Sequence, residues 1–332
     1  MEIKRPYLMF LGDAPDQLAA KTAYGVAYWR PDWCVGQLRL PGCQADLKLK
    51  DMTVAEAQAA GVKTVIVGVA NRGGVFSDVW VDVLVEALER GMDLAAGLHG
   101  RLRDVPRIRE AAERCGRALF DVRHPTRTFP VGNGKKRAGK RLLTVGTDVS
   151  SGKKYTALAI ELEMRKRGMK ADFRATGQTG VLIAGSGTAI DAVVADFISG
   201  AVETLAPDND PDHWDVIEGQ GSLFHPSYSG VTMGLIHGAQ PDLLVMCHEP
   251  TRRHVRGLPH YALPSLEECI EANVWAARRT NPAAKCAGIS LNTWQMSEID
   301  ALRTIDEIQH RLGLPTVDSV RTGTAKIVDA VV

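Results

Sequence analysis

The sequence predicts an α/β protein made of two parallel-sheet domains, a Rossmann-like N-terminal domain and a P-loop-type C-terminal domain. Three observations lead to this fold class. Apolar, β-branched segments alternate with segments of helical periodicity along the chain, which is the βαβ pattern of open parallel sheets. A basic stretch with prolines and glycines divides the chain near residue 130. A glycine-bounded loop at residues 146–152 lies between an apolar strand and a helix, as phosphate-binding loops do.

Length and composition are those of a soluble protein with two domains of ordinary size. The chain has 332 residues, 45% hydrophobic and 24% charged, with a net charge of +1. This charge gives no electrostatic argument for binding nucleic acid or a membrane surface, and no segment approaches the ~18 apolar residues of a membrane span. The six cysteines are scattered and form no CxxC pair, so we expect reduced thiols and neither a zinc site nor disulfides. We therefore expect a cytoplasmic protein.

Residues 1–122 are predicted to form the Rossmann-like domain. Strands are expected at 7–11, 64–69, 93–96 and 118–122, and helices at 79–90 and 105–115. The strand at 64–69 is the clearest, because Thr-Val-Ile-Val-Gly-Val is a continuous apolar run of the kind found in buried parallel strands. Ligands bind at the carboxyl ends of such strands, so Asn71 and Arg72 in the next loop are candidate substrate-binding residues. A simple tight turn is an equally good interpretation.

Residues 123–140 are predicted to be a basic linker. They contain two prolines, three glycines and the run Lys135-Lys136-Arg137, which favours a solvated connector. Residues 141–332 are expected to form the P-loop-type domain that binds a phosphate-bearing ligand. Its strands are expected at 142–145, 170–174, 214–217, 242–247, 286–291 and 315–320, and its helices at 153–167, 188–205, 266–279 and 298–312.

The loop after the first strand of this domain has the features that bind phosphates. Its glycines let the backbone approach a polyphosphate, its N–H groups face the anion, and the following helix adds partial positive charge. Lys153 would place an ammonium on the phosphates. The Ser or Thr that usually follows this lysine and ligates Mg²⁺ is replaced by Lys154. The expected ligand-binding residues are Gly146, Thr147, Asp148, Ser150, Ser151, Gly152, Lys153, Lys154 and Tyr155.

Polar motifs also follow three later strands. They occupy residues 175–180, 218–222 and 290–293, and the carboxyl ends of parallel strands meet at one sheet edge, so we expect all of them to reach one crevice. The candidate substrate-binding residues in them are Gln178, Thr179, Gln220 and Asn292. Arg252 and Arg253, in the arginine- and histidine-rich loop 248–260, are further candidates, since arginine binds carboxylates bidentately. A flexible, solvated loop is the alternative.

These motifs resemble those of two known protein families. Residues 146–153, 178–180 and 218–221 resemble the loops of dethiobiotin synthetase and its relatives, over the second domain alone. Over the whole chain, the Gly-Thr-Asp-x-Ser-x-Gly-Lys loop and the segment Cys-His-Glu-Pro-Thr-Arg at 247–252 resemble the DgcN-type D-glutamate N-acetyltransferase family. That resemblance implies acetyl-CoA as the donor, D-glutamate as the acceptor and a place in D-amino-acid catabolism.

The residue chemistry agrees with metal-free acetyl transfer. CoA carries phosphates, but moving its acetyl group needs no Mg²⁺, so the loss of the metal-ligating hydroxyl at Lys154 fits. Asp148 and Glu218 could still hold a metal, which leaves open an ATP-dependent ligase or carboxylase like dethiobiotin synthetase. A nucleotide-sensing regulatory protein is a further alternative. We expect a homo-oligomer, because Rossmann-like domain pairs often form dimers or larger assemblies.

Acetyl transfer to an amine needs a general base and donors for the oxyanion. Glu218 is the first candidate base, because a carboxylate at a strand end is easily desolvated, although a metal-ligand, capping or ion-pair role is equally plausible. Asp148 is the second candidate and could instead pair with Lys153. His225 is the third and could be structural. Backbone N–H groups of residues 151 and 152, or the Asn292 amide, could bind the oxyanion.

Overall fold

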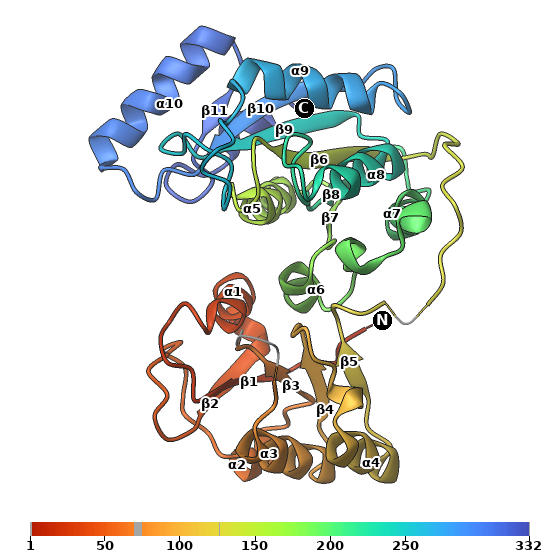
Figure 1. Ribbon diagram of the computed structural model, residues 1–332, viewed down its shortest axis with the longest axis vertical. Coiled ribbons are helices and arrows are strands. Elements are labelled where there is room, and N and C mark those ends of the chain that lie inside the picture. The colour runs from red at the N-terminus through yellow and green to blue at the C-terminus, as the bar shows by residue number, and fades with distance from the viewer. Residues whose placement is uncertain (1, 70–74, 126, 332) are drawn as a thin grey trace. The chain divides into compact units, whose positions relative to one another are not determined.

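The computed structural model describes residues 2–69, 75–125 and 127–331, and it divides into two α/β units (Figure 1). The first unit consists of residues 1–127 and 177–192, and the second of residues 128–176 and 193–332. Residues 177–192 therefore belong to the first unit, whereas the sequence expectation placed them in the second. Each unit is built around its own parallel sheet, as the fold class predicted.

The first unit contains a five-stranded parallel sheet in the order β2-β1-β3-β4-β5. The strands are β1 (Tyr7–Gly12), β2 (Cys34–Arg39), β3 (Thr64–Val67), β4 (Asp93–Ala96) and β5 (Leu119–Asp121). The helices are α1 (Lys21–Trp29), α2 (Val54–Ala59), α3 (Asp78–Glu89), α4 (Pro106–Cys115) and α6 (Gln178–Ala184). Helices α2, α3 and α4 lie on one side of this sheet, and α1 contacts α6 on the other side (Figure 1). Every residue of β1 and β3 is buried, which explains their unbroken apolar sequences.

The second unit contains a six-stranded parallel sheet in the order β11-β10-β9-β6-β8-β7. The strands are β6 (Lys140–Gly146), β7 (Ala171–Arg174), β8 (Trp214–Ile217), β9 (Leu243–His248), β10 (Lys285–Leu291) and β11 (Thr316–Val317). The helices are α5 (Lys153–Lys166), α7 (Ile198–Leu205), α8 (Ser229–Ala239), α9 (Leu266–Ala277), α10 (Glu298–Leu312) and α11 (Ala325–Asp329). Helices α5 and α9 lie on opposite sides of the sheet (Figure 1). The loops that follow β6, β8, β9 and β10 all leave from the same sheet edge, which positions the site described below.

Two of the segments assigned from the sequence have a different structure. The helix expected at 188–205 is instead two 3₁₀ turns, Ile190–Ala192 and Ala195–Phe197, followed by α7. The helix cannot run through, because the chain passes from the first unit to the second after Ala192. Residues 178–180, expected to form a strand-end loop, begin helix α6.

The basic linker is also less solvated than expected. Arg137 is buried, and its guanidinium donates to the carbonyl oxygens of Gly238 at 2.5 Å and Ala239 at 3.2 Å. Burial lowers the pKa of Arg137 to about 10. Lys136 pairs with Asp242 at 3.0 Å. The end of this stretch is therefore attached to the second unit by specific contacts.

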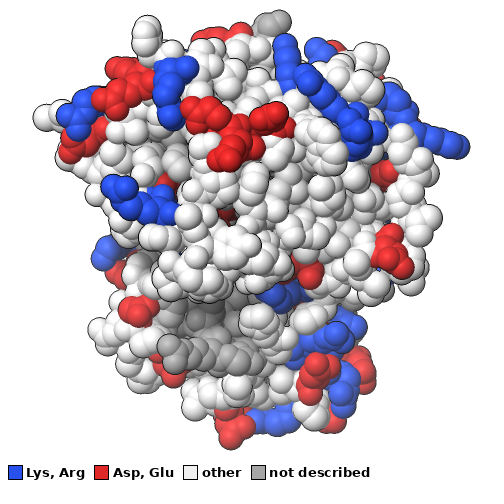
Figure 2. All heavy atoms as spheres, turned by 45° about the horizontal axis from the view of Figure 1, so that its top comes forward, with Lys and Arg blue, Asp and Glu red and all other residues white. Residues whose placement is uncertain are grey.

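The surface agrees with the near-zero net charge. Figure 2 shows side chains of both signs, several of them side by side, with uncharged surface between the groups on the face that it displays. In the part of the chain that the structure describes, no helix has the length and apolar character needed to span a membrane.

Candidate functional site

The phosphate-binding loop connects β6 to α5 and has the tight geometry that its sequence predicted. Gly152 precedes α5 with a φ of 106°, a conformation that glycine adopts without strain. A Cβ atom on Gly146 would lie 2.5 Å from Ser151 Oγ and 3.0 Å from Lys153 Nζ, so any larger residue there would displace the serine hydroxyl and crowd the lysine ammonium. Ser150 also has a positive φ of 55°. The loop is therefore a compact turn around the lysine ammonium.

Lys153 is buried inside this loop, and its partners there are uncharged. Its Nζ donates to the backbone oxygen of Asp148 at 2.7 Å and lies 3.4 Å from Ser151 Oγ, which itself donates to the Asp148 oxygen at 3.0 Å. Burial lowers the pKa of Lys153 to about 8. A buried ammonium that is held by neutral oxygens at a helix N-terminus favours an incoming anion.

The loop after β8 approaches Lys153 closely. A Cβ atom on Gly219 would lie 1.7 Å from the Thr144 backbone oxygen and 3.0 Å from Lys153 Cδ. Gly219 N also donates to Thr144 Oγ1 at 3.0 Å. Gly219 is thus required for the contact between this strand end and the phosphate-binding loop.

We expect Gly219→Ala to lower the free energy of unfolding by about 2–3 kcal/mol, because the added methyl group overlaps a backbone oxygen that can move only with its strand. Gly230→Ala is the matched control: nothing lies within 4 Å of its Cβ position in α8, so it should raise stability by about 0.5–1 kcal/mol. Chemical denaturation measures both. Equal stability of the Gly219→Ala and wild-type proteins would contradict the close approach.

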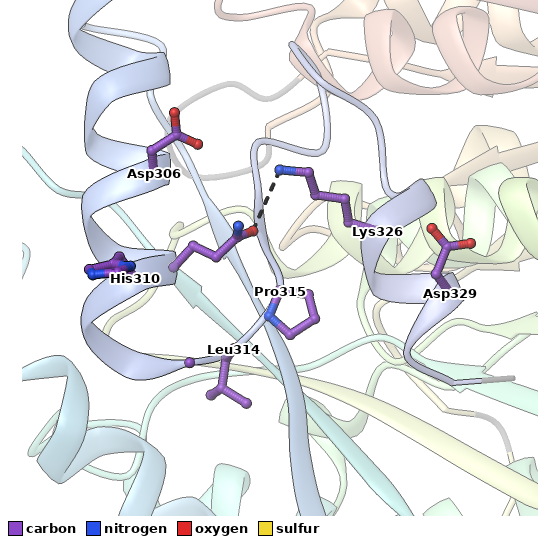
Figure 3. Close-up of a pocket in the computed structure, with 8 residues that line it drawn as sticks. Asp306, His310, Leu314, Pro315, Lys326 and Asp329 are labelled. Carbon is purple, nitrogen blue, oxygen red and sulfur yellow. Dashed lines mark hydrogen bonds between the residues drawn. The ribbon is translucent and has the colours of Figure 1, made fainter.

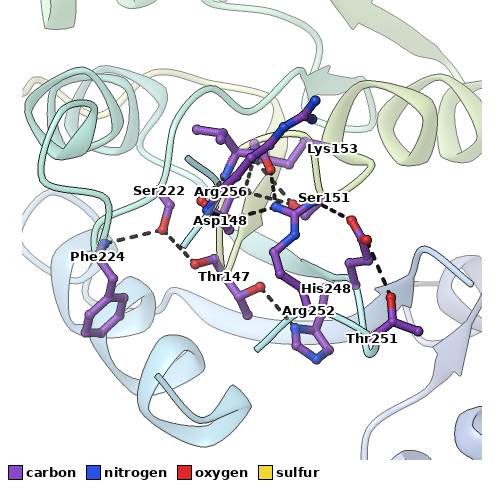
Figure 4. A network of polar contacts seen from close by, with 12 residues as sticks. Thr147, Asp148, Ser151, Lys153, Ser222, Phe224, His248, Thr251, Arg252 and Arg256 are labelled. Atoms are coloured by element: carbon purple, nitrogen blue, oxygen red, sulfur yellow. Dashed lines mark hydrogen bonds and ion pairs between the residues drawn. The ribbon is translucent and has the colours of Figure 1, made fainter. Parts of the chain in front are cut away.

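Asp148 links the phosphate-binding loop to the loop after β9 (Figure 4). It is buried, and its Oδ1 accepts from Val149 N at 2.7 Å. Its Oδ2 accepts from the Arg252 guanidinium and from Arg256 N, both at 2.7 Å. With both oxygens engaged in this way, Asp148 fits a positioning role better than that of a general base.

Arg252, a predicted substrate-binding residue, is already neutralised. Its guanidinium contacts Asp148 and Glu249 and donates to the Val149 oxygen at 2.6 Å. Arg253 is exposed and lines neither of the two cavities described below. The Arg252 guanidinium is therefore already paired with carboxylates, and Arg253 lies outside both cavities.

The end of β9 contacts the phosphate-binding loop through His248. His248 Nδ1 lies 3.0 Å from Thr147 Oγ1, and burial, with the positive charges of Arg252 and Arg311, lowers the pKa of His248 to about 4. Its ring is therefore neutral at pH 7. Cys247 is fully buried, and burial raises the pKa of its thiol to about 11, which fits a core cysteine.

Glu218, the first candidate base, lies at the end of β8 beside the lysine. It is buried, its Oε2 accepts from Thr176 N at 3.0 Å, and its backbone oxygen accepts from Thr176 Oγ1 at 2.6 Å. Its negative charge acts on Lys153. Gln220, from the same motif, lies 3.4 Å from Thr176 Oγ1 through its amide nitrogen. The structure thus brings these predicted residues together at one strand end.

Other predicted residues make contacts of their own or are not described. His225 sits in the turn before α8, where its Nδ1 accepts from Ser227 N at 3.2 Å and its ring lies 4.4 Å from that of Tyr228. Gln178 and Thr179 belong to the first unit, not to the second as expected. Asn71 and Arg72 lie outside the described residues, so their roles stay predictions.

Two cavities adjoin the phosphate-binding loop and share Asn292 and Trp294 as a common wall. The larger, of about 680 Å³, is lined by Ser150, Glu249, Arg252, His254, Val255, Arg256, Gly257, Pro259, Asn292, Trp294 and Gln295. The smaller, of about 200 Å³, is lined by Ser151, Gly152, Tyr155, Thr156, Ser290, Leu291, Asn292, Trp294, Asp318, Ser319 and Val320. Lys154 Nζ lies 5.2 Å from the centre of the Tyr155 ring.

The sequence reasoning had not proposed Arg256 or Trp294 as site residues. Arg256 belongs to the basic loop that was recognised, but its spacing alone did not separate it from its neighbours. Trp294 follows Asn292 by two residues and is strongly exposed. A tryptophan three residues after a predicted strand end was the signal that could have identified it.

A third cavity, of about 800 Å³, lies elsewhere in the second unit (Figure 3). It is lined by Asp306, Gln309, His310, Gly313, Leu314, Pro315, Lys326 and Asp329. Residues 313–315 precede β11, so this cavity lies at the amino edge of the parallel sheet, opposite the phosphate-binding loop. We therefore assign it no part in the site.

The lowered pKa of Lys153 predicts a pH dependence of anion binding. Below pH 8 the ammonium is charged and ready for an anion; as the pH rises through about 8, the free protein loses this charge. Affinity for a phosphate-bearing ligand should then fall by about tenfold per pH unit until the pKa of the complex is reached. Calorimetric titrations between pH 7 and pH 10 measure this. Lys153→Met should flatten the profile, and an equal slope in that variant would contradict the assignment.

Comparisons with known proteins agree with this architecture. Residues 130–328 match the model of a P-loop domain of unknown function, DUF1611_C, and residues 38–125 match a Rossmann-like domain of unknown function, DUF1611_N. A protein of Tritonibacter scottomollicae named D-glutamate N-acetyltransferase is 58% identical over 99% of this chain and 98% of its own length. A protein of the same name from a Pseudoalteromonas species is 48% identical over 99% of each chain.

A crystal structure shares the whole fold. A DUF1611 family protein from Anabaena variabilis superposes with a TM-score of 0.85, at 31% identity, over 99% of each chain.

Proposed function

Because this chain belongs to the DUF1611 family of paired Rossmann-like and P-loop domains, we propose that it has the activity for which its two curated relatives are named, D-glutamate N-acetyltransferase. The donor is acetyl-CoA. The acceptor amine attacks the thioester carbonyl, the carbon–sulfur bond breaks, and the products are N-acetyl-D-glutamate and CoA thiol. In this proposal the phosphate-binding loop of the second unit holds the phosphates of CoA.

The observation that carries this assignment is the buried ammonium of Lys153. It sits at the start of α5 among neutral oxygens, and no described carboxylate forms an ion pair with it. A pyrophosphate or phosphate would supply the missing negative charge and would accept from the loop N–H groups. This arrangement supports an anionic donor at the loop.

The loop works without a metal ion in this proposal. Lys154 stands where the Mg²⁺-ligating hydroxyl of P-loop nucleotide hydrolases stands, and a thioester needs no metal to transfer its acyl group. The charges of Lys153 and Lys154, with the helix N-terminus, take over neutralisation of the phosphates.

Glu218 is the proposed general base. The acceptor arrives as an ammonium and must lose a proton before it attacks. Glu218 is a buried carboxylate next to Lys153, and it lines neither of the two cavities. The N–H groups of residues 151 and 152, or the Asn292 amide, stabilise the oxyanion that forms on the carbonyl oxygen. Asn292 lines both cavities, so it lies where a donor in one and an acceptor in the other would meet.

The cellular setting is part of the proposal. All six cysteines are free thiols, which supports a reducing compartment, and we place the protein in the cytoplasm as a homo-oligomer that acts in D-amino-acid catabolism.

The test of the activity is release of CoA thiol from acetyl-CoA, with D-glutamate, L-glutamate or no acceptor, in EDTA and without ATP. We expect release that depends on D-glutamate and tolerates the chelator. No release with any acidic amino acid would overturn the proposal, and Mg²⁺-dependent ATP hydrolysis in its place would favour a ligase.

A further inference from the structure

We propose that the larger cavity is the acceptor site and that Arg256 is the residue that binds the side-chain carboxylate of the acidic acceptor. This inference rests on the proposed function. Arg256 lines the cavity, and none of the described residues forms a hydrogen bond or ion pair with its guanidinium. Figure 4 shows its side chain extending away from the polar network that holds Arg252.

The charges around the cavity single out Arg256. Arg252 also lines it, but Asp148 and Glu249 already balance the Arg252 charge. Arg253 and Arg256 are both exposed, but only Arg256 lines the cavity. Of the three arginines in this loop, Arg256 alone combines a place in the cavity wall with a guanidinium for which the described residues provide no carboxylate.

The backbone fixes Arg256 relative to the phosphate-binding loop. Its N–H donates to Asp148 Oδ2 at 2.7 Å. The preceding residue, Val255, is buried and donates through its N–H to the Tyr261 oxygen at 2.9 Å, and Leu258 N donates back to the Val255 oxygen at 2.9 Å. The arginine therefore projects from a braced turn, so less freedom is lost when an anion binds.

The placement favours the acceptor carboxylate over a phosphate of CoA. The start of α5, with Ser151, Gly152 and Tyr155, opens into the smaller cavity, whereas the larger one receives only Ser150 from the phosphate-binding loop. A donor anchored at the helix N-terminus leaves the larger cavity for the second substrate. The planar guanidinium matches a carboxylate with two parallel hydrogen bonds.

The experiment compares D-glutamate with its neutral isostere D-glutamine in wild type, Arg256→Met, Arg256→Lys and the control Arg253→Met. We expect Arg256→Met to lower kcat/KM for D-glutamate on the order of 10²-fold, with D-glutamine and the KM for acetyl-CoA little changed. Arg256→Lys should lose less of kcat/KM for D-glutamate, because lysine keeps the positive charge but cannot form the two parallel hydrogen bonds of a guanidinium. Arg253→Met should behave as wild type.

Three results for Arg256→Met would overturn the inference. The first is an equal loss of kcat/KM for both acceptors, and the second is no loss at all. The third is a raised KM for acetyl-CoA alone, which would place a phosphate on Arg256. Calorimetric binding of D-glutamate to the CoA complex separates this inference from the proposed function. If the wild type shows no acetyl transfer but binds D-glutamate only with Arg256 intact, the function fails and the inference stands. If it shows no transfer and no binding, both fail.

Discussion

Replacing Lys153 with methionine is expected to lower kcat/KM for acetyl-CoA by roughly 10²–10³-fold, the cost of removing one charged contact to a buried anion. Methionine fills similar volume, so the loop keeps its packing and loses the ammonium. Stability should not fall, because burial of the charge is unfavourable in the free protein, as the lowered pKa of about 8 indicates. Steady-state thiol release and calorimetric acetyl-CoA binding measure the effect.

Lys166→Met is the matched control. Lys166 lies on the same helix but is exposed. It should leave kcat/KM unchanged. If Lys153→Met binds acetyl-CoA as tightly as the wild type, the donor phosphates are not in this loop.

Glu218→Gln is expected to lower kcat by about 10²–10⁴-fold, the range that general base catalysis contributes. The amide oxygen of glutamine can still accept from Thr176 N, so the strand end should keep its structure. Because the change affects proton transfer and not the phosphates, affinity for acetyl-CoA should be retained. Rapid-quench and binding measurements on one preparation separate the two effects.

Asp148→Asn and His225→Gln test the other candidate bases. Asp148→Asn should weaken the Arg252 and Arg256 contacts and so raise KM more than it lowers kcat. His225→Gln should mainly affect stability, since the contacts of His225 lie within its own turn. If Glu218→Gln keeps wild-type kcat while one of these variants loses it, the base has been assigned to the wrong residue.

Local sequence signals were sufficient for the phosphate-binding loop and its flanking elements. The apolar strand β6, the positive-φ glycine before α5 and the lysine at its start are specified within a few residues, so no long-range contact is needed to recognise them. The strand at Thr64–Val67 was equally clear, since it is buried along its length.

Long-range organisation was harder to predict. Helix α6 follows β7 directly in sequence but packs in the first unit, against α1. Nothing in its seven residues indicates which sheet it will join. The chain passes back to the second unit after Ala192, and this is why the helix expected at 188–205 does not run through.

Helix α8 was not predicted from the sequence, because its glycines weaken the helical signal. Gly234 and Gly238 lower helix propensity, but both are needed where α8 crosses α7. A Cβ atom on Gly234 would lie 2.7 Å from Ile198 Cγ2, and one on Gly238 would lie 2.3 Å from the Ser199 oxygen. Tertiary packing here outweighs intrinsic propensity.

In the candidate site, residue types were easier to predict than partners. The basic loop was predicted to bind an anionic substrate, but only the fold shows that Asp148 and Glu249 pair with Arg252 and leave the Arg256 guanidinium at the cavity. The pairing of Arg252 with Asp148 joins residues 104 positions apart, which no local pattern records.

The most direct test of the central claim, that the phosphate-binding loop holds CoA without a metal ion, is a crystal structure of the CoA complex grown in EDTA. We predict a CoA phosphate within hydrogen-bond distance of the backbone N–H groups of residues 151–153 and of Lys153 Nζ, with the ammonium withdrawn from the Asp148 oxygen. CoA bound away from this loop, or bound there only when Mg²⁺ is supplied, would contradict the account.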